Sequence, residues 1–222
     1  MDKTQIRNAS TVILVRETSQ GRAILMGQRG SNAAFMPNKF VFPGGAVDEA
    51  DHDIPLATQL NQTCSDRLAN TKGGASPSAM AVAAIRELWE ETGLTLSAGK
   101  DWSDPPPAWE PFSPEGQMPS AETLKFAFRA ITPPGRPRRF DARFFIANAE
   151  SIDSDLDDFS AATDELSHLQ WVNLDNAKSL DLPFITQVVL AEVSRLGDIS
   201  EPPAAVPFFN YRTETPEITY ID

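Results

Sequence analysis

Three glutamates fall within five positions of the segment RELWEETGL (residues 86–94), namely Glu87, Glu90 and Glu91. If the segment is helical, like charges at this spacing repel each other by roughly a few tenths of a kcal/mol per pair. Mg²⁺ and Mn²⁺ prefer carboxylate oxygens, so a bound cation would turn this repulsion into coordination. The alternative is a solvated acidic face, which is the usual meaning of a run of charges. The segment therefore predicts either a divalent-cation site or an exposed helix surface.

The segment SPSAMAVAAIRELWEETG (76–93) predicts the helix that carries these glutamates. Ser76 is a suitable N-cap, Pro77 suits the first helical position, and Gly93 ends the helix. On a helical wheel the carboxylates share one arc with Met80, Ala83 and Ala84, and the opposite side holds Val82, Ile85, Leu88 and Trp89. We expect a buried apolar side, room for a ligand beside the small alanines, and an Arg86 side chain that holds one carboxylate by two hydrogen bonds.

A glycine-rich stretch lies upstream of this helix. Residues 39–45, KFVFPGG, predict a strand that enters a turn, because Pro43 cannot donate to a sheet and two glycines follow it. Together with RELWEETGL, this stretch resembles the Nudix box, G-x5-E-x7-R-E-U-x-E-E-x-G-U, in which U is a bulky aliphatic residue. The matching positions are Gly45, Arg86, Glu87, Leu88, Glu90, Glu91, Gly93 and Leu94.

The chain departs from this pattern in two places. Asp51 stands where the pattern has Glu, and 34 residues separate Asp51 from Arg86 where the pattern has seven. The box thus carries an insertion of 27 residues, about 52–78, which is tolerable because the cost of closing a loop grows slowly with its length. The insertion is either a plain surface loop or a lid or dimer contact beside the substrate, so a homodimer is left open.

The resemblance implies a fold, an activity and a set of site residues. It implies one Nudix domain over residues 1–222, an α/β (α+β) fold in which a mixed sheet lies between helices as an α/β/α sandwich. It also implies hydrolysis of a nucleoside diphosphate linked to another moiety, with Mg²⁺ or Mn²⁺ as cofactor. The implied metal ligands are Glu87, Glu90, Glu91 and the carbonyl of Gly45. Arg86 would orient a glutamate, and the general base would be Glu87, Glu91 or Glu165, unless Glu165 is only a solvated loop charge.

Substrate binding is expected from arginines and from the glycine turn. The candidates are Arg29, Arg136, Arg138, Arg139, Gly44 and Gly45, and the arginines are chosen because a guanidinium matches the geometry of phosphate. The stretch PPGRPRRFD (133–141) could equally be a solvated basic turn. Four aromatic residues either stack on a base or lie in the core, namely Trp102, Trp109, Phe140 and Phe144.

The stretch ILMGQRGSNAAFMPNKFVFPGG (24–45) resembles the coenzyme A diphosphatase branch of the family. Leu25, Arg29 and FPGG agree with that branch, some of whose members carry a long insertion inside the box. Coenzyme A or acyl-CoA is therefore the first expected substrate, and ADP-ribose or NADH is the alternative. A Nudix-fold module that binds a nucleotide without cleaving it is the alternative of another class.

Composition limits the classes of partner. The 222 residues include 31 acidic and 19 basic side chains, for a formal net charge of −12, and such a surface repels nucleic-acid backbones. The single cysteine, Cys64, cannot form an internal disulfide, which indicates a reducing compartment. The N-terminus has no apolar signal segment, and no apolar run approaches membrane-spanning length. We expect a cytoplasmic protein that binds a small molecule, with no nucleic-acid or membrane partner.

The remaining elements follow from hydrophobic patterning. Expected strands are 10–16 and 23–29, which form a hairpin, together with 140–149 and 166–174. Expected helices are part of 55–70, the segment SAETLKFAFRAIT (120–132), and 183–196. The last 25 residues, 198–222, are proline-rich and predict an extended tail packed on the domain. Strands mixed with helices, without regular alternation, predict a layered α+β domain.

Overall fold

The computed structural model describes residues 5–33, 35–71, 73–99, 101–211 and 215–222. Lys72 of the predicted insertion and residues 212–214 of the predicted tail lie outside the described residues. The central feature is a nine-stranded sheet in which the strand order is β11-β10-β7-β8-β1-β2-β3, while β4 also pairs with β1 and β9 with β2. The pairs β1–β8 and β10–β7 are parallel and the others are antiparallel, so the sheet is mixed.

The strands of this sheet are β1 (Ile6–Thr18), β2 (Gly21–Arg29), β3 (Phe40–Val41), β4 (Gly44–Ala46), β7 (Lys125–Ile131), β8 (Arg139–Asn148), β9 (Leu166–Asn173), β10 (Val206–Asn210) and β11 (Glu217–Ile221). A separate small sheet pairs β5 (Ser97–Ala98) with β6 (Met118–Pro119). The predicted hairpin of 10–16 and 23–29 is confirmed as β1 and β2, whose register joins Thr18 to Gly21.

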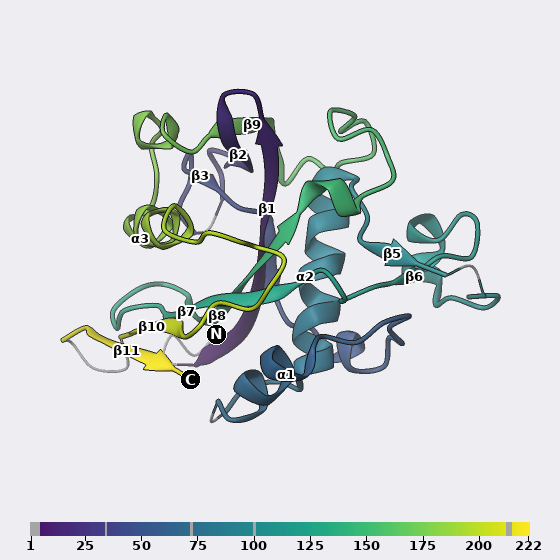
Figure 1. Cartoon of the computed structure of the whole chain (residues 1–222), viewed down its shortest axis with the longest axis horizontal. Coiled ribbons are helices and arrows are strands. Elements are labelled where there is room, and N and C mark those ends of the chain that lie inside the picture. Colours follow the sequence, from purple (N-terminus) through teal and green to yellow (C-terminus); the bar gives the residue numbers. More distant parts are fainter. Residues whose placement is uncertain (1–4, 34, 72, 100, 212–214) are drawn as a thin grey trace.

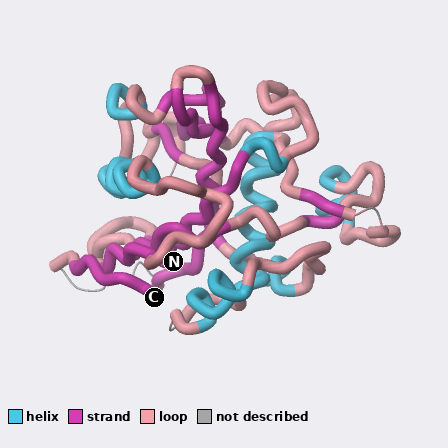
Figure 2. The backbone as a smooth tube through the Cα atoms, in the orientation of Figure 1, coloured by secondary structure: helices cyan, strands magenta, loops and turns pink. Residues whose placement is uncertain are grey.

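Helices cover both faces of the sheet (Figures 1 and 2). The α-helices are α1 (Gln62–Ala69), α2 (Pro77–Thr92) and α3 (Phe184–Val193), and short 3₁₀ helices are η1 (Glu49–His52), η2 (Pro107–Phe112), η3 (Ala149–Ser151) and η4 (Ala177–Ser179). One core lies between the sheet and α2, and a second core lies between the sheet and α3. This arrangement confirms the predicted α/β/α layers.

Helix α2 begins and ends where the sequence predicts, but its burial is greater than predicted. Ser76 Oγ accepts a hydrogen bond from the Ala79 N–H at 3.2 Å, and Gly93 ends the helix with a φ of 80°. The expectation of room beside the alanines is wrong, because Ala83 and Ala84 have no exposed surface. Protein atoms fill the space beside them, and only the C-terminal end of α2 is left to carry a site.

Residues 120–132 were expected to form a helix, and this prediction is wrong. They contain strand β7, in which all seven residues are buried. Phe126 belongs to the core under α2 and Phe128 to the core under α3, so the strand is covered on both faces. A continuous apolar run of this kind has no period that separates a buried strand from a buried helix. Pairing with β8 on one side and β10 on the other decides between them.

The insertion in the box forms part of the core. Helix α1 lies in it, and its Cys64 and Leu68 are buried in the cluster under α2. The Phe126 N–H of β7 donates to Cys64 Sγ at 3.2 Å, and burial raises the pKa of this thiol. Arg67 donates to the carbonyls of Pro203 and Ala204, both at 2.7 Å, which joins the insertion to the C-terminal segment.

The C-terminal segment extends the sheet. Strand β10 pairs with β7, and β11 pairs with β10 at the edge of the sheet, where Ile218 and Tyr220 are exposed. Among the residues described, no helix has the length and apolar character needed to span a membrane.

Candidate active site

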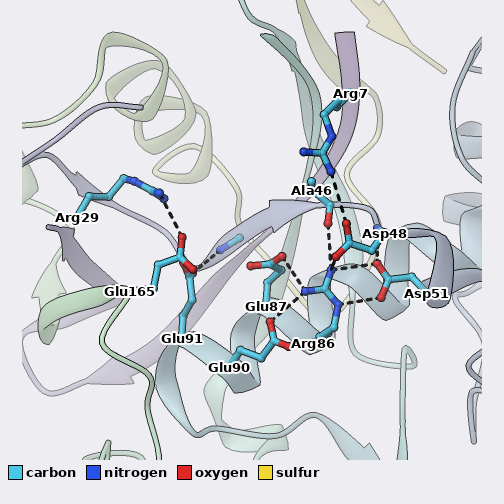
Figure 3. Close-up of polar contacts among 11 residues, drawn as sticks. Arg7, Arg29, Ala46, Asp48, Asp51, Arg86, Glu87, Glu90, Glu91 and Glu165 are labelled. Carbon is cyan, nitrogen blue, oxygen red and sulfur yellow. Dashed lines mark hydrogen bonds and ion pairs between the residues drawn. The ribbon is translucent and has the colours of Figure 1, made fainter. Parts of the chain in front are cut away.

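The glycine turn and the C-terminal part of α2 meet at a cluster of carboxylates (Figure 3). Strand β4 places the Gly44 N–H 2.8 Å from Oε2 of Glu91. A Cβ atom on Gly45 would overlap the carboxylate of Glu87, so only glycine lets that carboxylate lie directly against the backbone. Two elements far apart in the sequence thus bring Gly44, Gly45, Glu87 and Glu91 together.

Arg86 joins the turn to the helix. Its Nε and Nη2 donate to the two carboxylate oxygens of Asp51 at 2.8 and 3.0 Å. Its Nη1 donates to Glu87 at 2.9 Å and to Glu90 at 3.0 Å, and Nη2 also donates to the Ala46 carbonyl at 3.0 Å. Burial disfavours the charged guanidinium, but the hydrogen bonds to Asp51 and the nearby carboxylates outweigh it and raise the pKa of Arg86. The expected two-bond contact is present, and its partner is Asp51.

The carboxyl groups of Glu87 and Glu91 lie where little water reaches them. Burial raises the pKa of Glu87 to about 7, an effect that Arg86 opposes and that Glu90 and Glu165 reinforce. Burial also raises the pKa of Glu91 well above its ordinary value, against the hydrogen bond from Gly44. The positive charges of Arg86 and Arg29 therefore do not offset the cost of burying Glu87 and Glu91 when both are ionised.

Glu165 lies beside the cluster, on the loop that precedes β9 (Figure 3). The Thr163 N–H donates to the Glu90 carbonyl at 2.9 Å, which fixes this loop to the end of α2. Glu165 is close enough to raise the pKa of both Glu87 and Glu91, and it forms an ion pair with Arg29 at 3.3 Å. The structure thus brings together Arg29 and Glu165, which the sequence separates by more than half the chain.

The carboxylate oxygens at this site are the kind of ligand that a hard divalent cation prefers. Among the described residues, neither the buried Oε1 of Glu91 nor Oε2 of Glu87 has a hydrogen-bond partner. In the described part of the chain, no group of three or more His, Cys, Asp or Glu side chains is arranged to hold a metal ion. Arg86 holds one oxygen each of Glu87 and Glu90. The unsatisfied carboxylate oxygens are nevertheless of the type that Mg²⁺ and Mn²⁺ bind.

A cavity of about 790 Å³ lies on the α3 face of the sheet, and none of the clustered carboxylates is among its lining residues. Gly44 and Arg29 line it and also contact Glu91 and Glu165, respectively, so the cavity borders the carboxylates. Aromatic side chains form much of its wall: Phe35, Phe42, Phe140, Phe144, Phe184 and Tyr211. Its size is typical of a small-molecule site.

The other predicted site residues are divided between the cavity and the core. Arg136 and Arg138 line the cavity from the turn between β7 and β8. Arg139 is not in the lining and donates to the carbonyls of Thr132 and Tyr211, both at 3.0 Å. Phe140 and Phe144 line the cavity, whereas Trp102 and Trp109 are buried beside Trp89 in the core under α2.

Two features of the site were not predicted from the sequence. Asp51 was noted only as a departure from the family pattern, yet its buried carboxylate is the main partner of Arg86. Its position six residues after Gly45 was the available signal. Lys39 lines the cavity and pairs with Asp181, and no local pattern marked it.

Comparison with known proteins adds a family and a set of folds. A family model described as the NUDIX domain matches residues 6–193. The putative nudix hydrolase 7 of Caenorhabditis elegans is 28% identical over 180 residues, which cover 75% of this chain and 51% of that protein. The chain thus spans about half the length of this curated relative.

Two solved structures share the architecture. One is a NUDIX hydrolase from Alicyclobacillus acidocaldarius, with a TM-score of 0.60 and 24% identity over 84% of this chain and 90% of that one. The other is the NUDIX domain of Shewanella oneidensis NrtR in complex with ADP ribose, with a TM-score of 0.51 and 12% identity over 86% of this chain and 87% of that one. At these identities the likeness shows the fold alone.

Proposed function

Because this chain belongs to the Nudix family, we propose that it is a divalent-cation-dependent hydrolase that cleaves the pyrophosphate bond of a nucleoside diphosphate derivative. The observation that carries the proposal is Glu91, whose buried Oε1 has no hydrogen-bond partner among the described residues and whose Oε2 accepts from Gly44 in the cavity wall. A buried carboxylate oxygen without a partner costs free energy, so it indicates a group that the site is built to receive.

Glu87, Glu90, Glu91 and the carbonyl of Gly45 are the residues that would hold Mg²⁺ or Mn²⁺. When bound, the cation supplies neutralisation of the diphosphate oxygens and acidification of water. Arg86 acts as a positioning residue, because its contacts to Asp51 and to Glu87 and Glu90 fix the carboxylates rather than reach the cavity.

The remaining steps belong to side chains that face the cavity border. Arg29 Nε is buried and has no hydrogen-bond partner in the described part of the chain, so this guanidinium has a donor left for a phosphate oxygen. Glu87 is the first candidate to take a proton from the attacking water, because its carboxylate lies in the cluster and its Oε2 has no hydrogen-bond partner among the described residues. Glu91 and Glu165 are the alternative proton acceptors, since both lie in the same cluster.

Coenzyme A or an acyl-CoA is the first substrate that we propose. The cavity has an aromatic wall and also Arg29, Lys39, Arg136 and Arg138, which suits a ligand with both apolar and anionic parts. ADP-ribose and NADH are the alternative substrates for the same reaction. ADP-ribose is included in the test because the Shewanella oneidensis domain was solved in complex with it.

A second candidate function is nucleotide binding without cleavage. It is favoured by the ion pairs of Arg86 with Glu87 and Glu90, which give these carboxylates a protein cation as partner. Retention of all three glutamates of the box favours the enzyme.

The experiment that separates these functions is Glu91→Gln. Product release is measured by chromatography with Mg²⁺ and with Mn²⁺ on coenzyme A, acetyl-CoA, ADP-ribose, NADH and diadenosine polyphosphates. We expect roughly a thousandfold loss of kcat, in the range of a lost general base or charge-stabilising group. The melting temperature should not fall, because the amide oxygen keeps the Gly44 hydrogen bond and the buried charge is gone.

Glu150→Gln is the matched control, since Glu150 is an exposed carboxylate outside the site. Coenzyme A should yield adenosine 3′,5′-bisphosphate and phosphopantetheine. Preference for ADP-ribose or NADH would keep the activity and replace the substrate. No metal-dependent cleavage of any compound by the wild-type protein would favour the binding module instead.

A further inference from the structure

The cavity is positively charged in a negatively charged protein. The chain has a formal net charge of −12, yet Arg29, Lys39, Arg136 and Arg138 line the cavity and no described Asp or Glu does. Two of these cations already have partners at the rim: Arg29 pairs with Glu165, and Lys39 pairs with Asp181. The other two stand together on the turn between β7 and β8.

Arg136 and Arg138 are exposed cations without a partner in the described part of the chain. The turn that carries them is fixed at its base, because Arg139 donates to the Thr132 carbonyl and the Phe140 N–H donates to Thr132 Oγ1 at 3.0 Å. The two guanidinium groups are therefore presented by an anchored turn, although no protein carboxylate requires them there.

These two arginines are also separate from the carboxylate cluster. Arg86 pairs with Glu87 and Glu90, and Arg29 pairs with Glu165, whereas no ion pair among the described residues joins Arg136 or Arg138 to these carboxylates. A diphosphate at the cluster has Arg29 as its guanidinium partner. Arg136 and Arg138 line the same cavity from the turn between β7 and β8 and are available to a second anion.

We propose that Arg136 and Arg138 bind a phosphomonoester that the substrate carries in addition to its scissile diphosphate. The proposal rests on the proposed hydrolase function and narrows its substrate class to nucleotides with a phosphate on the ribose. A phosphomonoester has a charge of about −1.5 to −2 and three acceptor oxygens, which matches two guanidinium groups better than a single negative charge does. The aromatic wall beside the turn, where Phe35 and Phe140 meet at 5.6 Å between ring centroids, suits the apolar remainder of such a ligand.

The kinetic test compares substrates that differ only in this phosphate. Coenzyme A is compared with dephospho-coenzyme A for a 3′-phosphate, and NADPH with NADH for a 2′-phosphate. We expect the wild-type protein to favour the phosphorylated member of at least one pair by roughly tenfold in kcat/KM, carried mainly by KM, which corresponds to about 1.4 kcal/mol. In Arg136→Gln/Arg138→Gln this ratio should fall toward one.

Arg195→Gln is the matched control, because Arg195 is an exposed arginine at the end of α3 that pairs with Glu192 and does not line the cavity. It should keep the wild-type ratio. Equal kcat/KM for both members of both pairs in the wild-type protein would overturn the proposal while leaving the hydrolase function intact. A preference that survives in the double variant would overturn it as well.

A binding measurement keeps the inference testable if no compound is cleaved. Titration calorimetry would compare adenosine 3′,5′-bisphosphate and adenosine 2′,5′-bisphosphate with AMP on the wild-type protein and on the double variant. We expect roughly tenfold tighter binding of one bisphosphate, lost in the double variant and weakened by salt. Equal affinities for all three ligands, together with an absence of cleavage, would reject both the inference and the enzyme.

Discussion

At the scale of single residues, the site is defined by carboxylates that the protein itself leaves uncompensated. Glu91 is buried, Glu87 is mostly buried, and both have raised pKa values. Asp51, equally buried, is instead paired with Arg86 through two hydrogen bonds. Both oxygens of Asp51 are thus paired with Arg86, whereas Glu87 shares Arg86 with Glu90, and Oε1 of Glu91 has no partner among the described residues.

The raised pKa of Glu87 predicts how stability depends on pH without a cation. Its pKa rises from an ordinary 4.5 to about 7 in the folded protein, so folding favours the protonated form. This contribution is fully present below about pH 4.5 and is lost as pH rises through 7. We expect the free energy of unfolding in EDTA to fall by up to about 3 kcal/mol between pH 5 and pH 8, measured by urea denaturation.

Glu87→Gln is the comparison, and it should show a smaller fall over the same range because one titrating group is gone. Mg²⁺ binds the ionised form, so it should raise the melting temperature of the wild-type protein more at pH 8 than at pH 5. A stability that is constant or increases from pH 5 to pH 8 in EDTA would contradict this account.

The sequence was informative about residues with local or motif signals. The helix that carries Glu87, Glu90 and Glu91 was predicted with its first and last residues, because capping depends on neighbours in the chain. The role of Asp51 was not predicted, since its contact with Arg86 crosses the insertion. Tertiary contacts decide which side chain pairs with a buried acid, and a short stretch of sequence does not contain them.

At the scale of elements, local sequence signals predicted strands β1 and β2 but not strand β7. The hairpin has alternating and turn signals of its own, whereas β7 is defined by strands that pair with it from both sides. The insertion is a similar case. Its length and position were read from the box, but its packing on Phe126 and on the carbonyls of Pro203 and Ala204 depends on distant segments.

The packing of the insertion predicts that it supports the fold more than the chemistry. Leu68 of α1 is 1% exposed in the core under α2, and none of the described residues of the insertion lines the cavity. Leu68→Ala should lower the free energy of unfolding by roughly 2–5 kcal/mol through loss of buried surface and a residual cavity. The KM of the folded enzyme should stay within about twofold, because the cavity wall is not touched.

Thr63→Ala on the exposed side of the same helix is the control, and it should change stability by less than about 0.5 kcal/mol. Urea denaturation and steady-state kinetics on the folded protein measure the two quantities separately. A large rise in KM in Leu68→Ala at temperatures where it is fully folded would show that the insertion shapes the substrate site.

At the scale of the whole molecule, the cavity could not be predicted from the sequence. Arg29 comes from β2, Gly44 from β4, Phe184 from α3 and the two turn arginines from between β7 and β8. The sequence singled out the arginines and Gly44 by residue type, and it did not single out Phe184. Only the folded sheet and its connections place them around one volume, so the sequence could supply candidates for the wall but not its shape.

A buried charge network connects these parts of the molecule. Asp141 of β8 accepts from Arg129 Nε and Nη2 at 2.9 and 2.7 Å, and Arg143 lies 3.2 Å from the same carboxylate. Arg143 also donates to Asn8 of β1 at 2.8 Å, and to Thr71 of the insertion at 3.3 Å. The network therefore joins neighbouring strands of the sheet to the insertion.

This geometry predicts that Asp141 supports the whole fold. Asp141→Asn leaves two buried guanidinium groups without their common carboxylate, so the free energy of unfolding should fall by roughly 3–5 kcal/mol. Glu192→Gln removes the carboxylate of an exposed pair with Arg195 and should cost less than about 1 kcal/mol. Guanidinium chloride denaturation measures both variants. Equal losses in the two would mean that the buried network contributes no more than a surface ion pair, and that packing alone holds the insertion to the sheet.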